Sequence, residues 1–442
     1  MLPLFPDYLN GLWRFEQHKS ELGLCMVDFS LKKTIAECDA LFSAAEFASG
    51  THFLQTSFHN RLLPLLSKGC ISEEEVISLE KENSRLLIQN VQPAMVSLAS
   101  NLKALYGQGT NSGGLCRLPK GKEYYLSLLK QNTGSDKSIS EIKSLLTRRL
   151  SADFDSLKLL MQNSTTKEDL YAMRNLERLF PFSEGDMMLE DLQDKMIGDF
   201  PVITFNRFIR LYQIKKVPGD LQDYCAPAFF LPPELDDFYK NSIYLNVDSL
   251  TSGIDLYTTL AHEGFPGHLY QTVYHRIQNQ TRQVHPVEAL FQNNGFVEGW
   301  ALYVEFMAYD YAADCMGTGN SIEAHKYTTI MQLNCSLQLC LYSLLDLGIH
   351  YDDLSYEKTA QMLSAFGITN PATIRSIYEY IVEEPTNYLQ YYLGYLEILE
   401  LKIAARAAWG NQYSDLRFHK FLLDYGPADF TYLKDCLDSP YF

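Results

Sequence analysis

The chain has 442 residues, of which 46% are hydrophobic and 21% charged, a balance that excludes a wholly disordered protein. Its formal net charge of −17 argues against a nucleic-acid partner, because an acidic surface repels phosphate backbones.

No run approaches the roughly 20 apolar residues that span a bilayer, so no membrane span is expected. Nine scattered cysteines favour a reducing compartment. The expected location is the cytoplasm, with export left open if an N-terminal signal has been removed.

Apolar residues at three- and four-residue spacing predict that most of the chain is helical. The expected helices cover residues 73–106, 137–180, 321–349, 356–366 and 387–409. Ser72 and Glu75 form the pattern of a capping box at the start of the first helix, and Pro93 should kink or divide that helix. Ser138 or Ser140 should cap the second helix.

One region departs from the helical pattern. Residues 242–248 alternate in polarity and carry the Tyr, Ile and Val content of a strand, and residues 201–214 are a second candidate. No internal repeat and no linker between independent domains is apparent. We therefore predict a mainly α protein, a single unit over residues 1–442, with a small β-sheet near residues 250–310.

The strongest chemical signal is a histidine–glutamate pair at the end of a predicted helix, His262 and Glu263. Hydrolysis by zinc requires three protein ligands, an open position for water and a carboxylate base. The usual HExxH pattern places two histidines on one helical face, but His268 comes six residues after His262 and would face away on a regular helix. Pro266 and Gly267 can break the helix and bring His268 to the metal.

A third ligand is expected at Glu298, 36 residues after His262 in a glycine- and aromatic-rich segment. A carboxylate buried in such a setting needs a cation. Glu305 lies two helical turns further on and could accept a hydrogen bond from a ligating histidine, although a surface position is an equal alternative. Taken singly, each of these residues also has an ordinary structural interpretation, as a loop histidine or a structural glutamate.

The two segments HEGFPGHLYQ and EGWALYVE resemble the bacterial domain-of-unknown-function 885 family, whose members carry HE, an aromatic residue and PGH, followed by EGWA. Further segments that resemble the family in order are 113–135, 217–246, 383–402 and 418–433. The resemblance covers roughly residues 101–442 and is less clear over residues 1–100. Longer members of the family carry additional N-terminal sequence.

The resemblance implies a zincin-like, mostly helical, two-lobed fold similar to the thermostable carboxypeptidases and the neurolysin-like zinc peptidases. A deep channel would lie between the lobes, with the metal on its floor. In this interpretation His262, His268 and Glu298 bind Zn²⁺. Glu263 is the general base that takes a proton from the attacking water and passes it to the leaving amine.

Tyrosines complete the predicted site. Tyr391 matches the family's tyrosine in PTNYLQYYLG and would stabilise a developing oxyanion, with Tyr392 and Tyr395 as alternatives, although core packing is equally expected for any one of the three. Tyr244 to Asn246 is predicted to form an edge strand that pairs with an extended substrate.

The predicted function is that of a zinc metallopeptidase, a carboxypeptidase or an oligopeptidase, acting on a peptide substrate. One alternative is a peptide-binding protein that retains the channel without turnover, but Glu263 argues against it because a binder needs no base. Another alternative is a metal-dependent hydrolase of a non-peptide amide or ester, which would use the same water activation.

Overall fold

The computed structural model describes residues 2–109, 111, 113–162, 175–203, 212–233, 240–246, 253–282, 293–317 and 321–438. Within it the chain divides into two compact units. The first comprises Met1–Gly121, Pro218–Asp220 and Asp353–Glu383, and the second comprises Lys122–Val217, Leu221–Asp352 and Glu384–Phe442. The chain passes between the units several times, so neither unit is a contiguous domain.

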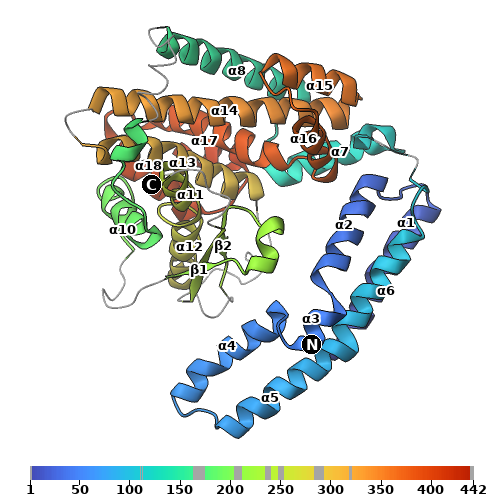
Figure 1. Cartoon of the computed structure of the whole chain (residues 1–442). Helices are drawn as coiled ribbons and strands as arrows, with labels where there is room; N and C mark the ends of the chain where they lie inside the picture. The colour runs from blue at the N-terminus through green and yellow to red at the C-terminus, as the bar shows by residue number, and fades with distance from the viewer. Residues whose placement is uncertain are drawn as a thin grey trace. The chain divides into compact units, whose positions relative to one another are not determined.

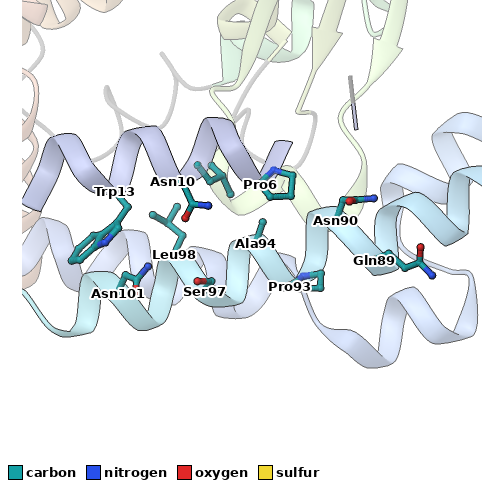
Figure 2. A pocket seen from close by; sticks show the side chains of 11 residues that line it. Pro6, Asn10, Trp13, Gln89, Asn90, Pro93, Ala94, Ser97, Leu98 and Asn101 are labelled. Atoms are coloured by element: carbon teal, nitrogen blue, oxygen red, sulfur yellow. The ribbon is translucent and has the colours of Figure 1, made fainter. Parts of the chain in front are cut away.

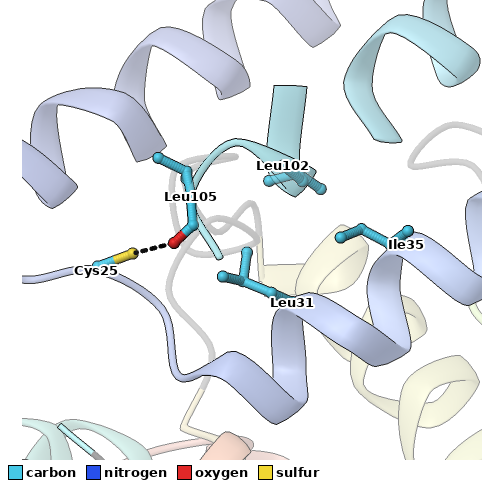
Figure 3. Close-up of a cluster of buried hydrophobic side chains, with 5 residues drawn as sticks. All are labelled: Cys25, Leu31, Ile35, Leu102 and Leu105. Carbon is cyan, nitrogen blue, oxygen red and sulfur yellow. Dashed lines mark hydrogen bonds between the residues drawn. The ribbon is translucent and has the colours of Figure 1, made fainter. Parts of the chain in front are cut away.

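The first unit is helical. Its helices are α1 (Phe5–Glu21), α2 (Asp28–Leu41), α3 (Ala44–Ser49), α4 (Phe53–Ser67), α5 (Glu73–Leu86), α6 (Gln92–Lys103), α15 (Tyr356–Ala365) and α16 (Pro371–Glu383). Helix α6 packs against both α1 and α2 (Figure 1). Figure 3 shows the apolar cluster that joins α2 to the end of α6, formed by Cys25, Leu31, Ile35, Leu102 and Leu105.

The predicted start and division of the helix at 73–106 are confirmed. Ser72 accepts a hydrogen bond from the Glu75 backbone, and the Glu75 side chain accepts one from the Ser72 backbone, which completes a capping box. A π-helical turn, Leu87–Val91, separates α5 from α6, and Pro93 stands in the first turn of α6. Proline is tolerated there because the first amides of a helix have no intrahelical acceptor.

A hollow of about 250 Å³ lies between α1 and α6 in this unit (Figure 2). Apolar side chains such as Leu9 and Trp13 line it together with amides such as Asn10 and Asn101, and none of its lining residues is charged. The hollow contains none of the predicted site residues, all of which belong to the second unit.

The second unit contains the remaining elements. Its helices are α7 (Gly121–Thr133), α8 (Ile139–Met161), α10 (Gly185–Lys195), α11 (Gly253–Glu263), α12 (His268–Arg282), α13 (Asn294–Cys315), α14 (Ser321–Tyr351), α17 (Asn387–Trp409), α18 (Asp415–Tyr425) and α19 (Phe430–Asp435). Helix α13 packs against α11, α14 and α17 and is the most enclosed of them (Figure 1). Trp300 and Phe296 of α13 are completely buried.

Glycines allow α13 and α17 to approach closely. A Cβ on Gly299 would lie 2.4 Å from the carbonyl carbon of Gly394, and a Cβ on Gly394 would lie 2.0 Å from the carbonyl oxygen of Gly295. No larger residue fits at these positions without separating the helices. The crossing therefore fixes α17 against the same helix that carries Glu298.

A small sheet has the strand order β1–β3–β2, with β1 (Tyr212–Lys216), β2 (Ala228–Leu231) and β3 (Asn241–Leu245). Strand β3 is parallel to β1 and antiparallel to β2. Burial in β3 does not alternate, because Asn241, Ser242, Ile243 and Leu245 are buried and Tyr244 is half-buried. The strand predicted at 242–248 is confirmed up to Leu245, while residues 247–248 and most of the candidate at 201–214 lie outside the described residues.

The other predicted helices are confirmed as α14, α15 and α17. The helix predicted at 137–180 ends at Met161, residues 163–174 lie outside the described residues, and Ser138 is the cap. The fold class is therefore confirmed as mainly α with a small sheet, whereas the two-lobed arrangement around a channel stays a prediction. Among the described helices, none has the length and apolar character to cross a bilayer.

Gly394→Ala should destabilise the second unit, because the added methyl group would overlap the Gly295 carbonyl oxygen. We expect a loss of about 3 kcal/mol in the free energy of unfolding and a lower Tm by circular dichroism. Gly11→Ala on exposed α1 is the control, since its Cβ would meet nothing within 4 Å, and it should be neutral or slightly stabilising. Equal melting temperatures for the two variants would contradict the close crossing.

Candidate metal centre

The predicted helix break between His262 and His268 is present. Helix α11 ends at Glu263 and α12 begins at His268. A Cβ on Gly267 would lie 1.8 Å from the carbonyl oxygen of His262, so only glycine allows the chain to turn back this closely. The buried indole of Trp300 donates a hydrogen bond to the Pro266 carbonyl oxygen at 2.9 Å and ties the break to α13.

The break brings the two imidazoles together. The ring centroids of His262 and His268 lie 4.8 Å apart, with their planes nearly perpendicular. Glu298, in the second turn of α13, places its Oε2 atom 3.5 Å from His262 Nε2 and 3.3 Å from His268 Nε2. This Oε2 atom is buried and has no hydrogen-bond partner.

These separations fit a shared metal ion better than direct hydrogen bonds. Two ligand atoms on a tetrahedral zinc, each bonded at about 2.1 Å, are separated by about 3.4 Å. All three ligand atoms lie within 4.8 Å of one another, and this trio is the one group of three or more His, Cys, Asp or Glu side chains among the described residues that is arranged to hold a metal. Two imidazoles and one carboxylate form a donor set that suits zinc.

Glu305 lies on the same face of α13 as Glu298, two turns further along. Its Oε2 atom lies 2.9 Å from His262 Nδ1. Because an ionised carboxylate can only accept, Nδ1 must carry the proton, which leaves the lone pair of Nε2 directed at the metal position. The alternative of a surface glutamate is wrong, since the Glu305 side chain is only 18% exposed.

Charge interactions within the cluster are strong. Burial by itself lowers the pKa of His262, but Glu298 and Glu305 outweigh burial and hold this pKa well above its usual value. Burial raises the pKa of Glu298, but His262 and His268 outweigh it and hold that pKa well below its usual range. A divalent cation at this position would replace the proton that the carboxylates otherwise stabilise on the imidazole.

Glu263, the predicted base, is the last residue of α11 and is half-buried. Its Oε2 atom accepts a hydrogen bond of 2.7 Å from the backbone amide of Phe230 in β2. This contact has no signature in the sequence, because it joins residues 33 positions apart through a main-chain group that any residue but proline would supply.

Tyr391 lies beside the candidate ligands, with its ring stacked 6.1 Å from that of His262. Its neighbours do not, and their prediction as substrate-binding residues is wrong. Tyr392 is completely buried and its hydroxyl bonds Ser336. Tyr395 is 5% exposed and packs edge-on against Phe306. Tyr392 is rotated by about 100° around α17 from Tyr391, whereas Tyr395 shares the face of Tyr391 but lies one turn further along the helix.

The prediction of Tyr244 to Asn246 as an edge strand is also wrong. They lie on or directly after β3, the central strand of the described sheet, whose backbone pairs on both sides. Tyr244 stacks on Phe229 at 5.1 Å, and the Asn246 amide donates to the carbonyl oxygens of Gln222 and Cys225. Strand β2 is an edge of this sheet instead, and it is the strand that contacts α11.

Similarity to solved structures extends over most of the chain. A protein described as "the putative lipoprotein from Colwellia psychrerythraea" is 20% identical with a TM-score of 0.81, over 99% of this chain and 74% of that chain. A second, described as "a putative lipoprotein of unknown function from Shewanella oneidensis", is 17% identical with a TM-score of 0.57, over 86% of this chain and 70% of that chain. At these identities the likeness shows a shared fold.

No curated protein matches the chain. The sequence model of the family described as "Bacterial protein of unknown function (DUF885)" matches residues 1–437. The match includes the first hundred residues, where the resemblance in sequence was less clear. It follows that the chain belongs to the DUF885 family.

Proposed function

We propose that the protein is a zinc-dependent metallohydrolase, and specifically a peptidase. The observation that carries this proposal is the buried, unpartnered Oε2 atom of Glu298, which lies between two imidazole nitrogens at 3.3 and 3.5 Å. A buried carboxylate oxygen without a hydrogen-bond donor is costly unless a cation compensates it. His262, His268 and Glu298 would hold that cation.

Zinc in this position would polarise a carbonyl group and lower the pKa of water toward about 7. The residues of the chain then have separate tasks. Glu305 keeps the proton of His262 on Nδ1. Glu263 takes a proton from the attacking water and later delivers it to the leaving group. Tyr391, stacked beside His262, can donate its phenolic hydrogen to the oxyanion that develops on the substrate.

A peptide is the substrate that the surroundings of Glu263 favour. Strand β2 is an edge strand among the described residues and contacts the helix that ends in Glu263. The Phe230 amide of this edge already bonds Glu263, but its other outward backbone groups can pair with an extended peptide and find fewer partners on a small ester. Cytoplasmic location stays a prediction. The two solved neighbours are described as lipoproteins, so export is the alternative. Cell fractionation would decide between the two locations.

Glu298→Ala should abolish stoichiometric zinc binding, because it removes one of three ligands. Metal content measured by elemental analysis after dialysis should fall from about one zinc per chain to a trace. Glu323→Ala is the matched control, since Glu323 is exposed on α14 and outside the cluster. A wild-type protein without zinc, or a Glu298→Ala variant that retains it, would remove the basis of the proposal.

Glu305→Gln should weaken zinc binding about 10- to 100-fold without abolishing it. The amide keeps the size of the side chain but replaces a charged acceptor by a neutral one opposite His262 Nδ1. Competition with a chromophoric chelator would measure the affinity, with Glu323→Gln as the control. Unchanged affinity would show that Glu305 has no part in holding the imidazole.

Glu263→Gln should retain zinc and lose about 10²- to 10⁴-fold in the rate of hydrolysis, because the amide cannot take up a proton. Cleavage of a mixed peptide library, followed by mass spectrometry, provides the measurement. Cleavage by this variant at the wild-type rate would refute the role of Glu263 as base. A zinc-loaded wild type that binds library peptides without cutting them would favour the non-catalytic alternative, and cleavage of model esters alone would favour the non-peptide hydrolase.

A further inference from the structure

We propose that the backbone amide of Phe230 is a positioning group for Glu263, so that strand β2 sets the orientation of the base. This inference rests on the proposed function, since it concerns the carboxylate that handles protons there. The group involved belongs to the main chain of residue 230, so its part does not depend on the phenylalanine ring. The contact is the 2.7 Å hydrogen bond from Phe230 N to Glu263 Oε2.

The strand pairing explains why this amide is available. In β2, Phe230 lies opposite Ile243 of the antiparallel strand β3. Antiparallel pairs alternate between hydrogen-bonded and non-hydrogen-bonded, and Pro227, three residues earlier, accepts its bond from Asn246 of the β3 segment. Residues 227, 229 and 231 therefore point their backbone groups at β3, whereas the amide of Phe230 points outward, where Glu263 receives it.

A flexible side chain at a helix end needs such an anchor. Glu263 is the last residue of α11, and a glutamate loses up to about 2 kcal/mol of rotamer entropy when it is fixed. A bond from the rigid sheet to Oε2 fixes the carboxylate in advance and leaves Oε1 for proton transfer. Misplacement of a catalytic group by about 1 Å can cost 100-fold in rate, so loss of this hydrogen bond is expected to lower the rate.

Phe230→Pro removes the amide hydrogen while the strand is kept. Proline is tolerated at edge-strand positions whose N–H points away from the sheet, which is the situation of Phe230. Phe230→Ala is the matched control, because it removes the ring but retains the amide. The difference between the two variants therefore reports the loss of the amide hydrogen together with the displacement of the Glu263 carboxylate by the proline ring, apart from the packing of the phenylalanine side chain.

The first test measures the affinity of zinc-loaded protein for acetohydroxamate by titration calorimetry. This probe chelates a metal through two oxygens and shares its hydrogen with a neighbouring carboxylate, so its affinity reports the placement of Glu263 without any turnover. We expect Phe230→Pro to bind it at least about tenfold more weakly than Phe230→Ala, the effect of one hydrogen bond to a charged group. In a Glu263→Gln background the same two variants should bind it equally.

The second test needs no metal. Amide hydrogen exchange of the metal-free protein should show that Glu263→Ala speeds exchange at Phe230, while Leu231, whose amide faces β3, remains protected. Fast exchange at Phe230 in the wild type would refute the hydrogen bond.

The inference would be overturned if Phe230→Pro and Phe230→Ala bound the hydroxamate with equal affinity. It would also be overturned if Phe230→Pro lost the same affinity with Glu263 intact as with Glu263→Gln, because the contact would then have only a structural role. The absence of zinc from the wild type would instead overturn the proposed function on which it rests.

Discussion

The buried Oε2 atom of Glu298 and the two imidazoles that face it are the interaction on which the rest of the centre depends. This atom lies 3.5 Å from His262 Nε2 and 3.3 Å from His268 Nε2 and has no hydrogen-bond partner. Burying a charge in this way costs several kcal/mol unless a counter-charge enters the space between the three groups. In the proposed function, a cation held by His262, His268 and Glu298 would supply that counter-charge.

Helix α13 holds this cluster together. One face carries Glu298 and, two turns on, Glu305, which bonds His262. Its glycines pack against α17 through Gly394, one turn before which stands Tyr391. The indole of Trp300 reaches the break between α11 and α12. A single helix thus positions two carboxylates, the imidazole that one of them bonds and the tyrosine beside it, because all of these contacts start from one rigid element.

Local sequence was sufficient for several features because they depend on residues close together in the chain. The capping box at Ser72, the division before Pro93 and the helix break at Gly267 each follow from backbone chemistry within a few residues. The pairing of His262, Glu263, His268 and Glu298 was predicted from spacing, ligand chemistry and family resemblance together. The structure brings His262, His268 and Glu298 into one cluster.

What the sequence could not determine is which side of an element faces the centre and which strand ends at an edge. Tyr391, Tyr392 and Tyr395 are equivalent as residue types, and only the family resemblance favoured Tyr391. The tertiary structure places the ring of Tyr391 beside His262 and buries the other two. Strand alternation predicted β3 but not its central position, which depends on pairing with β1 and β2. The hydrogen bond from Phe230 to Glu263 could not be predicted from the sequence either, because a main-chain donor has no signature there. Such a donor acquires its partner only when the tertiary structure brings the two segments together.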